Sequence, residues 1–249
     1  MSGADKTCEV VEDALLDGRV RLRQPAKGYR VAIDPVFLAA AVPARPNTHA
    51  LDLGCGVGAA ALCLLARVPE ARIAGLEVQA ELAALARVNA TLNGFDERFR
   101  VVEGDLSDPV ELPTGGFDEV LCNPPHQPAA ASAPPDRAKA LATHEDPAGL
   151  ENWVDAALTF ARANGGLTFV HRADRLDDLL AALRGKAGGV VVFPLWPGDG
   201  QPAKRVLVRA RKAIRAPARL SQGLVLHDAQ GRYTAAAGAV LRGGEGLAL

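Results

Sequence analysis

The chain has 249 residues, 49% of them hydrophobic, which predicts one large domain, alone or with a small appendage, and a sizeable buried core. Twenty-eight basic and 29 acidic residues leave a net charge of −1, which argues against a protein that coats nucleic acid through its global charge. The longest apolar stretches, 36–42 and 59–66, fall far short of the roughly 18 residues of a transmembrane helix. The first ten residues lack the apolar run of a secretory signal, so we expect a soluble, cytoplasmic protein without membrane association.

Cysteine and histidine spacing gives little support to a metal site. The four cysteines form no CxxC pair and the five histidines no HxxxH pair. We therefore expect no metal, and thiols that are buried and reduced.

Helix and strand patterns alternate along the middle of the chain. Strands are predicted at 49–53, 72–77, 100–102, 119–122, 166–171, 190–195 and 205–211, and helices at 59–67, 81–93, 150–163 and 173–184. The alternation implies parallel strands covered by helices on both faces, and the last strand follows its neighbour without a helix. We therefore expect a doubly wound α/β fold with a seven-stranded, mostly parallel sheet that contains one antiparallel strand.

A glycine-rich loop follows the first strand of this sheet. Glycines let the backbone turn tightly and approach a ligand, and the next helix offers free N–H groups. The spacing fits the G-x-G-x-x-G/A pattern of dinucleotide sites, which leaves NAD open at this point. Asp52, two residues before the first glycine, favours a ligand with an ammonium group, and S-adenosylmethionine carries one where a nicotinamide dinucleotide does not. The loop residues assigned to a cofactor are Asp52, Gly54, Gly56 and Gly58.

Two further strand ends add candidate cofactor residues. Glu77 ends the second strand, and its two oxygens suit a pair of ribose hydroxyls. Asp105 follows the third strand and suits an adenine amino group. The alternatives are a surface carboxylate for Glu77 and a turn or helix N-cap aspartate for Asp105. Val78 and Leu106, the next residues, are assigned to the same site.

The segment Asn123-Pro124-Pro125-His126 follows the fourth strand. Two prolines fix the backbone and bring no N–H of their own, so the asparagine side chain and the carbonyl of Pro124 can point at one spot. Two such acceptors suit a planar NH2 group. By accepting both of its hydrogens they free the nitrogen lone pair for attack on a sulfonium methyl, although an ordinary loop is the alternative.

This combination of glycine loop and Asn-Pro-Pro resembles class I S-adenosylmethionine-dependent methyltransferases that act on planar amino groups. More narrowly, the chain is similar to the bacterial family that methylates N6 of an adenine in valine tRNA, from about residue 9 to 240. The segments that carry this narrower resemblance are 12–16, 24–25 with 28–34 and 38–40, 203–208, and 224–227 with 231–234.

The resemblance implies S-adenosylmethionine as the cofactor and tRNA as the partner. It implies that Asn123, Pro124, Pro125 and His126 form the catalytic segment, with His126 stacked on a flipped base. The family usually carries Tyr or Phe where His126 stands, and an imidazole stacks with less area. We expect residues 1–48 to pack on the cofactor side, residues 49–217 to form the methyltransferase domain, and residues 218–249 to form a C-terminal extension.

Two alternatives to tRNA adenine methylation remain open. A protein glutamine amide fits the same Asn-Pro-Pro clamp, and a module that keeps the fold but not the chemistry would only bind RNA. The basic residues between 204 and 219, and those between 19 and 30, are either a solvated face or a phosphate-contacting surface.

Overall fold

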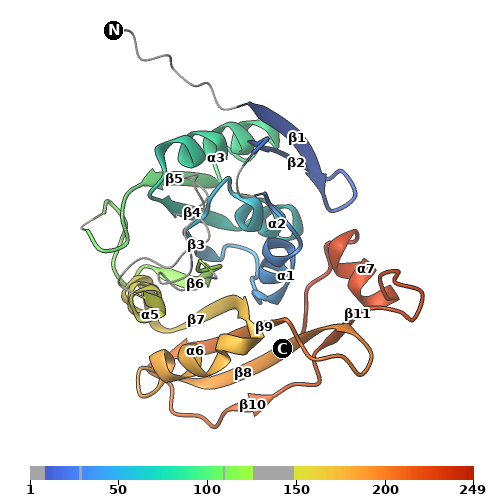
Figure 1. Ribbon diagram of the computed structural model, residues 1–249. Coiled ribbons are helices and arrows are strands. Elements are labelled where there is room, and N and C mark those ends of the chain that lie inside the picture. Colours follow the sequence, from blue (N-terminus) through green and yellow to red (C-terminus); the bar gives the residue numbers. More distant parts are fainter. Residues whose placement is uncertain (1–8, 28–29, 109, 126–148) are drawn as a thin grey trace, which may run out of the picture.

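The computed structural model describes residues 9–27, 30–108, 110–125 and 149–249, and in this part of the chain one mixed sheet forms the centre of the molecule (Figure 1). Its strand order is β10-β8-β9-β7-β6-β3-β4-β5, and β11 also pairs with β8. In this sheet, β9 pairs antiparallel with β7 and β8, and the other described pairs are parallel. The strands are β3 (His49–Leu53), β4 (Arg72–Glu77), β5 (Phe99–Glu103), β6 (Phe117–Cys122), β7 (Ala161–Arg172), β8 (Ala187–Gly198), β9 (Arg205–Lys212), β10 (Arg219–Leu220) and β11 (Leu224–His227).

The predicted doubly wound fold is confirmed, and so is its single antiparallel strand. The seven predicted strands are present, and the short strands β10 and β11 extend the β8 edge of the sheet beyond them. Helices cover both faces, which buries apolar residues on each side. One face carries α1 (Asp34–Ala41), α2 (Ala59–Arg67), α3 (Ala80–Leu92) and α7 (Ala235–Leu241), and the other carries α5 (Gly149–Phe160) and α6 (Leu176–Leu183), which a 3-10 turn (Ala173–Arg175) precedes.

Among the predicted boundaries that are wrong, the helix expected over 173–184 begins at Leu176, and the helix expected over 150–163 ends at Phe160. Ala161 begins β7 instead, where it is fully buried and pairs with Phe117. Asn164 has a left-handed φ of 60° and two glycines follow it, so the chain has strong local reasons not to continue as a helix.

The N-terminal part forms a hairpin that the sequence patterns did not predict. Strands β1 (Val10–Leu15) and β2 (Val20–Pro25) pair antiparallel, and β2 alternates buried and exposed residues. Its outward-facing Arg21 and Arg23 both reach Glu12, at 2.7 and 3.4 Å. These arginines of the basic segment 19–30 therefore lie on one exposed face of a strand.

The C-terminal segment closes on the hairpin and on α1. The Arg19 side chain donates to the carbonyls of Arg242 and Gly243, and the Leu247 N–H donates to the Ala40 carbonyl at 2.8 Å. The hairpin and the C-terminal segment thus pack on the same helical face of the sheet as α1.

Candidate functional site

The predicted site residues lie along one edge of the sheet. Strands β5, β4, β3 and β6 are neighbours and run parallel, so their carboxyl ends share that edge. In such sheets ligands bind beyond the carboxyl ends, where the strand order reverses. Across the edge the structure places, in this order, Asp105 after β5, Glu77 at the end of β4, Asp52 near the end of β3 and Asn123 after β6.

Asp52 is a buried carboxylate beneath the first turn of α2. It is 3% exposed, and its Oδ2 accepts a hydrogen bond from the Ala61 N–H at 3.1 Å. Burial raises its pKa to about 7, and the nearby charge of Glu77 adds to the rise. A cationic partner would lower the cost of ionising it.

Glu77 holds the glycine loop through its carboxylate. Its Oε2 accepts from the Gly56 N–H at 2.8 Å and its Oε1 from the Gln79 N–H at 2.9 Å. Burial raises its pKa, while these backbone hydrogen bonds oppose the rise. Each carboxylate oxygen keeps acceptor capacity, since a carboxylate offers about four lone-pair directions.

The three glycines of the loop differ in what surrounds them, although each has a positive φ. A Cβ built on Gly54 would lie 2.7 Å from Trp153, and one on Gly58 would lie 2.7 Å from Phe99. A Cβ on Gly56 would meet nothing within 4 Å in the described residues. Packing therefore explains two of the glycines, and Gly56 is the one that leaves open space for a ligand.

Two buried polar atoms near this loop make no hydrogen bond within the described part of the chain. They are Oδ1 of Asn123, an acceptor, and Nε1 of Trp153, a donor. Asn123 follows Cys122, which pairs with Leu53 directly before the loop, and the Trp153 ring lies against Gly54. A buried unpaired polar group is costly, so both atoms suit a bound molecule. No local pattern marks Trp153, a helical residue of α5, as a site residue.

The remaining predicted residues frame this centre. Pro124 and Pro125 are buried behind Asn123, whereas Val78 is 52% exposed beside Glu77. Asp105 Oδ1 accepts from the Ser107 N–H and hydroxyl, both at 2.8 Å, in the turn after β5. Leu106 packs partly buried at the same strand end. His126 lies outside the described residues.

The basic segment 204–219 is largely engaged within the protein. Arg209 pairs with Glu119 at 3.0 Å, and Arg205 pairs with Asp34 at 2.8 Å. Lys212 donates to the Ala161 carbonyl at 2.9 Å. Since β9 runs antiparallel to β7, Lys212 at its end lies toward the sheet edge opposite the glycine loop. The ion pair with Glu119 favours a structural role for Arg209 over contact with phosphate.

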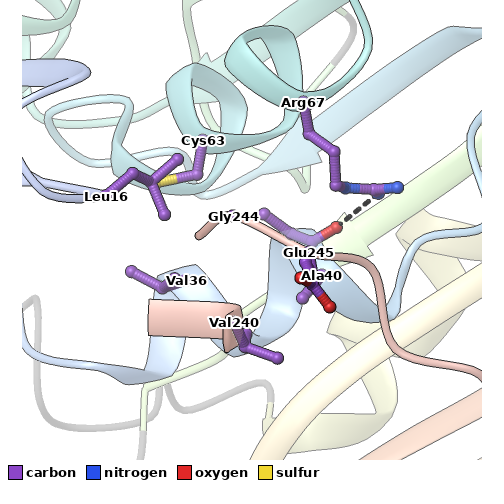
Figure 2. A pocket seen from close by; sticks show the side chains of 9 residues that line it. Leu16, Val36, Ala40, Cys63, Arg67, Val240, Gly244 and Glu245 are labelled. Carbon is purple, nitrogen blue, oxygen red and sulfur yellow. Dashed lines mark hydrogen bonds between the residues drawn. The ribbon is translucent and has the colours of Figure 1, made fainter. Parts of the chain in front are cut away.

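A small cavity elsewhere holds none of these residues. Figure 2 shows it between the hairpin, α1, α2 and the C-terminal segment, with Leu16, Cys63, Val240 and Gly244 in its wall. Arg67 beside it donates to the Ala39 carbonyl at 2.8 Å. The cavity is therefore a packing gap under the C-terminal segment and separate from the loop.

None of the described helices combines the length and apolarity that a bilayer span requires. A search of the same residues finds no group of three or more His, Cys, Asp or Glu side chains suited to a metal ion.

Comparison with known proteins decides the family. The family model described as methyltransferase small domain matches residues 32–174, which contain the glycine loop and Asn-Pro-Pro. The chain belongs to this methyltransferase family. The solved structure of a predicted O-methyltransferase from Agrobacterium tumefaciens has a TM-score of 0.73 and 26% identity, and the match covers 86% of this chain and 98% of that one.

Two curated relatives bear on the substrate of this methyltransferase. The tRNA1(Val) (adenine(37)-N6)-methyltransferase of Porphyromonas gingivalis is 32% identical over 87% of this chain and 88% of its own length. The release factor glutamine methyltransferase of Deinococcus radiodurans is 34% identical, over 66% of this chain and 58% of its own. The first match confirms the resemblance to the adenine-N6 family.

Proposed function

We propose that this methyltransferase transfers a methyl group from S-adenosylmethionine to the exocyclic N6 amine of an adenine in tRNA. One observation carries the proposal: Asn123 Oδ1, at the strand end beside the glycine loop, is buried and has no hydrogen-bond partner among the described residues. An acceptor held in this way is suited to a neutral NH2 group. Similarity to the adenine-N6 methyltransferases over nearly the whole chain supports adenine 37 of a valine tRNA as the target.

The residues present fit the cofactor. Among the described residues, Gly56 leaves open space beside the loop. Asp52 is a buried carboxyl group whose raised pKa a bound cation would lower, and Val78 is an exposed apolar residue next to Glu77. The proposed cofactor-binding residues are Asp52, Gly54, Gly56, Gly58, Glu77, Val78, Asp105 and Leu106. The segment 1–48 is proposed to pack on the cofactor side of the domain 49–217, with 218–249 as the extension.

Bound S-adenosylmethionine supplies a methyl group on a positively charged sulfur. The side-chain oxygen of Asn123 and the carbonyl of Pro124 accept the two amine hydrogens, which directs the nitrogen lone pair away from the ring. The amine would become cationic as it accepts this methyl group. Two aligned acceptors stabilise that cation most, and its proton then leaves to water. His126 is proposed to stack on the extruded base.

A methyl-transfer assay tests the proposal. The protein and labelled S-adenosylmethionine are incubated in three separate reactions. One contains tRNA, one contains ribosomes, and one contains soluble protein from a bacterial lysate. We expect label in tRNA and N6-methyladenosine after digestion to nucleosides. Because its proposed substrate is tRNA, we also propose the cytoplasm as its place of action.

A glutamine amide is the second candidate, because the same clamp fits its NH2 group and a glutamine methyltransferase matches the chain. Label in a protein, recovered as N5-methylglutamine, would support this candidate and contradict tRNA methylation. A protein that fails to bind the cofactor in calorimetry would instead support an RNA-binding module without chemistry.

A further inference from the structure

Asn89 of α3 and Asn93, the residue directly after this helix, take the place of a neighbouring strand for β2. Asn89 Oδ1 accepts from the Arg23 N–H at 2.7 Å, and its Nδ2 donates to the Arg23 carbonyl at 2.9 Å. Asn93, one turn later, makes the same pair of bonds with the Arg21 backbone, at 2.8 and 2.7 Å. The two side-chain amides thus fasten the outer edge of the hairpin β1–β2 to α3.

Asn89 also reaches the glycine loop, and Asn93 does not. Asn89 Nδ2 donates to the carbonyl of Val57 at 2.9 Å, and Val57 stands between Gly56 and Gly58. The Asn93 amide instead donates to the Asn89 carbonyl at 2.7 Å. Asn89 is fully buried, so its hydrogen bonds are shielded from water.

The loop is therefore held from two directions. Glu77 accepts from the Gly56 N–H, and Asn89 donates to the next carbonyl along the chain. Left-handed glycines lose much conformational freedom on ordering, so each tether lowers the entropy that ligand binding must still remove.

We propose that Asn89 is a positioning residue that couples the hairpin β1–β2 to the cofactor loop, so that cofactor binding and hairpin order stabilise each other. The inference rests on the proposed cofactor. Asn89 has no role in the chemistry, because it acts through the Val57 carbonyl. The coupling is reciprocal by thermodynamic linkage. The free energy by which an ordered hairpin improves cofactor binding equals the free energy by which bound cofactor stabilises the hairpin.

A matched pair of variants tests the coupling by its effect on the cofactor. Asn89→Ala removes the bonds to β2 and to the loop, whereas Asn93→Ala removes comparable bonds to β2 alone. We expect the dissociation constant of S-adenosylmethionine, measured by calorimetry, to rise roughly three- to thirtyfold in Asn89→Ala and to stay within about twofold in Asn93→Ala. At saturating cofactor, kcat on tRNA should be nearly unchanged in both variants. Equal cofactor affinity in wild type and a folded Asn89→Ala would overturn the inference.

Hydrogen exchange on the unmodified full chain gives a second test that needs no destabilising variant. Addition of S-adenosylmethionine should slow amide exchange in hairpin peptides that contain Arg21 and Arg23, and this slowing should persist in Asn93→Ala. If the protein binds the cofactor but amide exchange in the hairpin is equally fast with and without it, the coupling is contradicted and the proposed function is not. A wild-type protein that does not bind the cofactor would contradict the proposed function.

Discussion

Individual side chains of the site combine burial with missing partners. Asp52 and Glu77 are nearly inaccessible carboxyl groups, and the charge of Glu77 adds to the rise in the pKa of Asp52. Asn123 presents an acceptor and Trp153 a donor, each buried without a partner in the described residues. Such groups are retained where a bound molecule satisfies them, which is the physical basis for placing cofactor and amine here.

Asp52 should make the free protein less stable as the pH rises from about 4 toward about 7. Its pKa is about 7 in the fold and near 3.8 when unfolded, so over this range the folded state binds more protons. Raising the pH removes a proton that the folded state holds more tightly. Thermal unfolding of wild type and Asp52→Asn without cofactor checks this, because the variant should lose that part of the pH dependence. Two parallel stability curves would exclude a raised pKa at Asp52.

Asn123→Ala should lower kcat roughly a hundredfold or more and leave cofactor affinity nearly intact. The lost acceptor matters most as the amine becomes cationic in the transition state. Single-turnover rates and calorimetry on one protein sample separate the two quantities, with Asn93→Ala as the control. A loss confined to cofactor affinity would remove Asn123 from the amine clamp.

Strands and loops show which parts of the fold could be predicted. Strand β3 has the predicted bounds because a short, buried apolar run ends in a glycine turn, and β4 has them for similar reasons. The hairpin was missed because the arginines of β2 suggested a basic surface rather than one side of an alternating strand. Asn89 was also missed, although an asparagine inside a helix, with another four residues later, is a visible signal of side-chain bonding to backbone.

The glycine loop should respond differently at two of its glycines. Alanine at either Gly54 or Gly56 carries the strain of a left-handed residue, roughly 1 to 2 kcal/mol. At Gly54 the new methyl also overlaps Trp153, whereas at Gly56 it enters open space. We expect thermal unfolding to show the larger loss for Gly54→Ala, and Gly56→Ala to lose cofactor affinity in a protein that still folds. The reverse order of stability would contradict this assignment of the open side of the loop.

The interior of the sheet contains a charge pair that should be structural. Arg209 on β9 and Glu119 on β6 have side chains 21% and 12% exposed, and burial raises the pKa of Glu119. Arg209→Ala should destabilise the protein by about 3 to 5 kcal/mol, because it leaves a buried carboxylate unpaired. Arg211→Ala, on the same strand but exposed, is the control and should cost little. Denaturant unfolding measures both, and equal stabilities would refute the pair's role.

At the scale of the whole molecule, the hairpin and the C-terminal segment pack against the same side of the methyltransferase core. The hairpin reaches the glycine loop through Asn89, and the C-terminal segment reaches the hairpin through Arg19. The contact of Arg19 with Arg242 joins residues more than 200 positions apart, so no local pattern could reveal it. The site residues could be proposed from the sequence because they lie near the carboxyl ends of strands in a recognisable parallel sheet, or in the loops that follow.

The proposed activity is tested most directly by the position of the methyl group on a defined RNA. Unmodified tRNA(Val) transcript is incubated with S-adenosylmethionine and either wild-type protein or Asn123→Ala, and nuclease fragments are analysed by mass spectrometry. We predict that the wild-type protein adds one methyl group, on N6 of adenine 37. The variant should add it at least about a hundredfold more slowly. An unmethylated transcript, from a protein that binds the cofactor and methylates a glutamine side chain instead, would contradict the account.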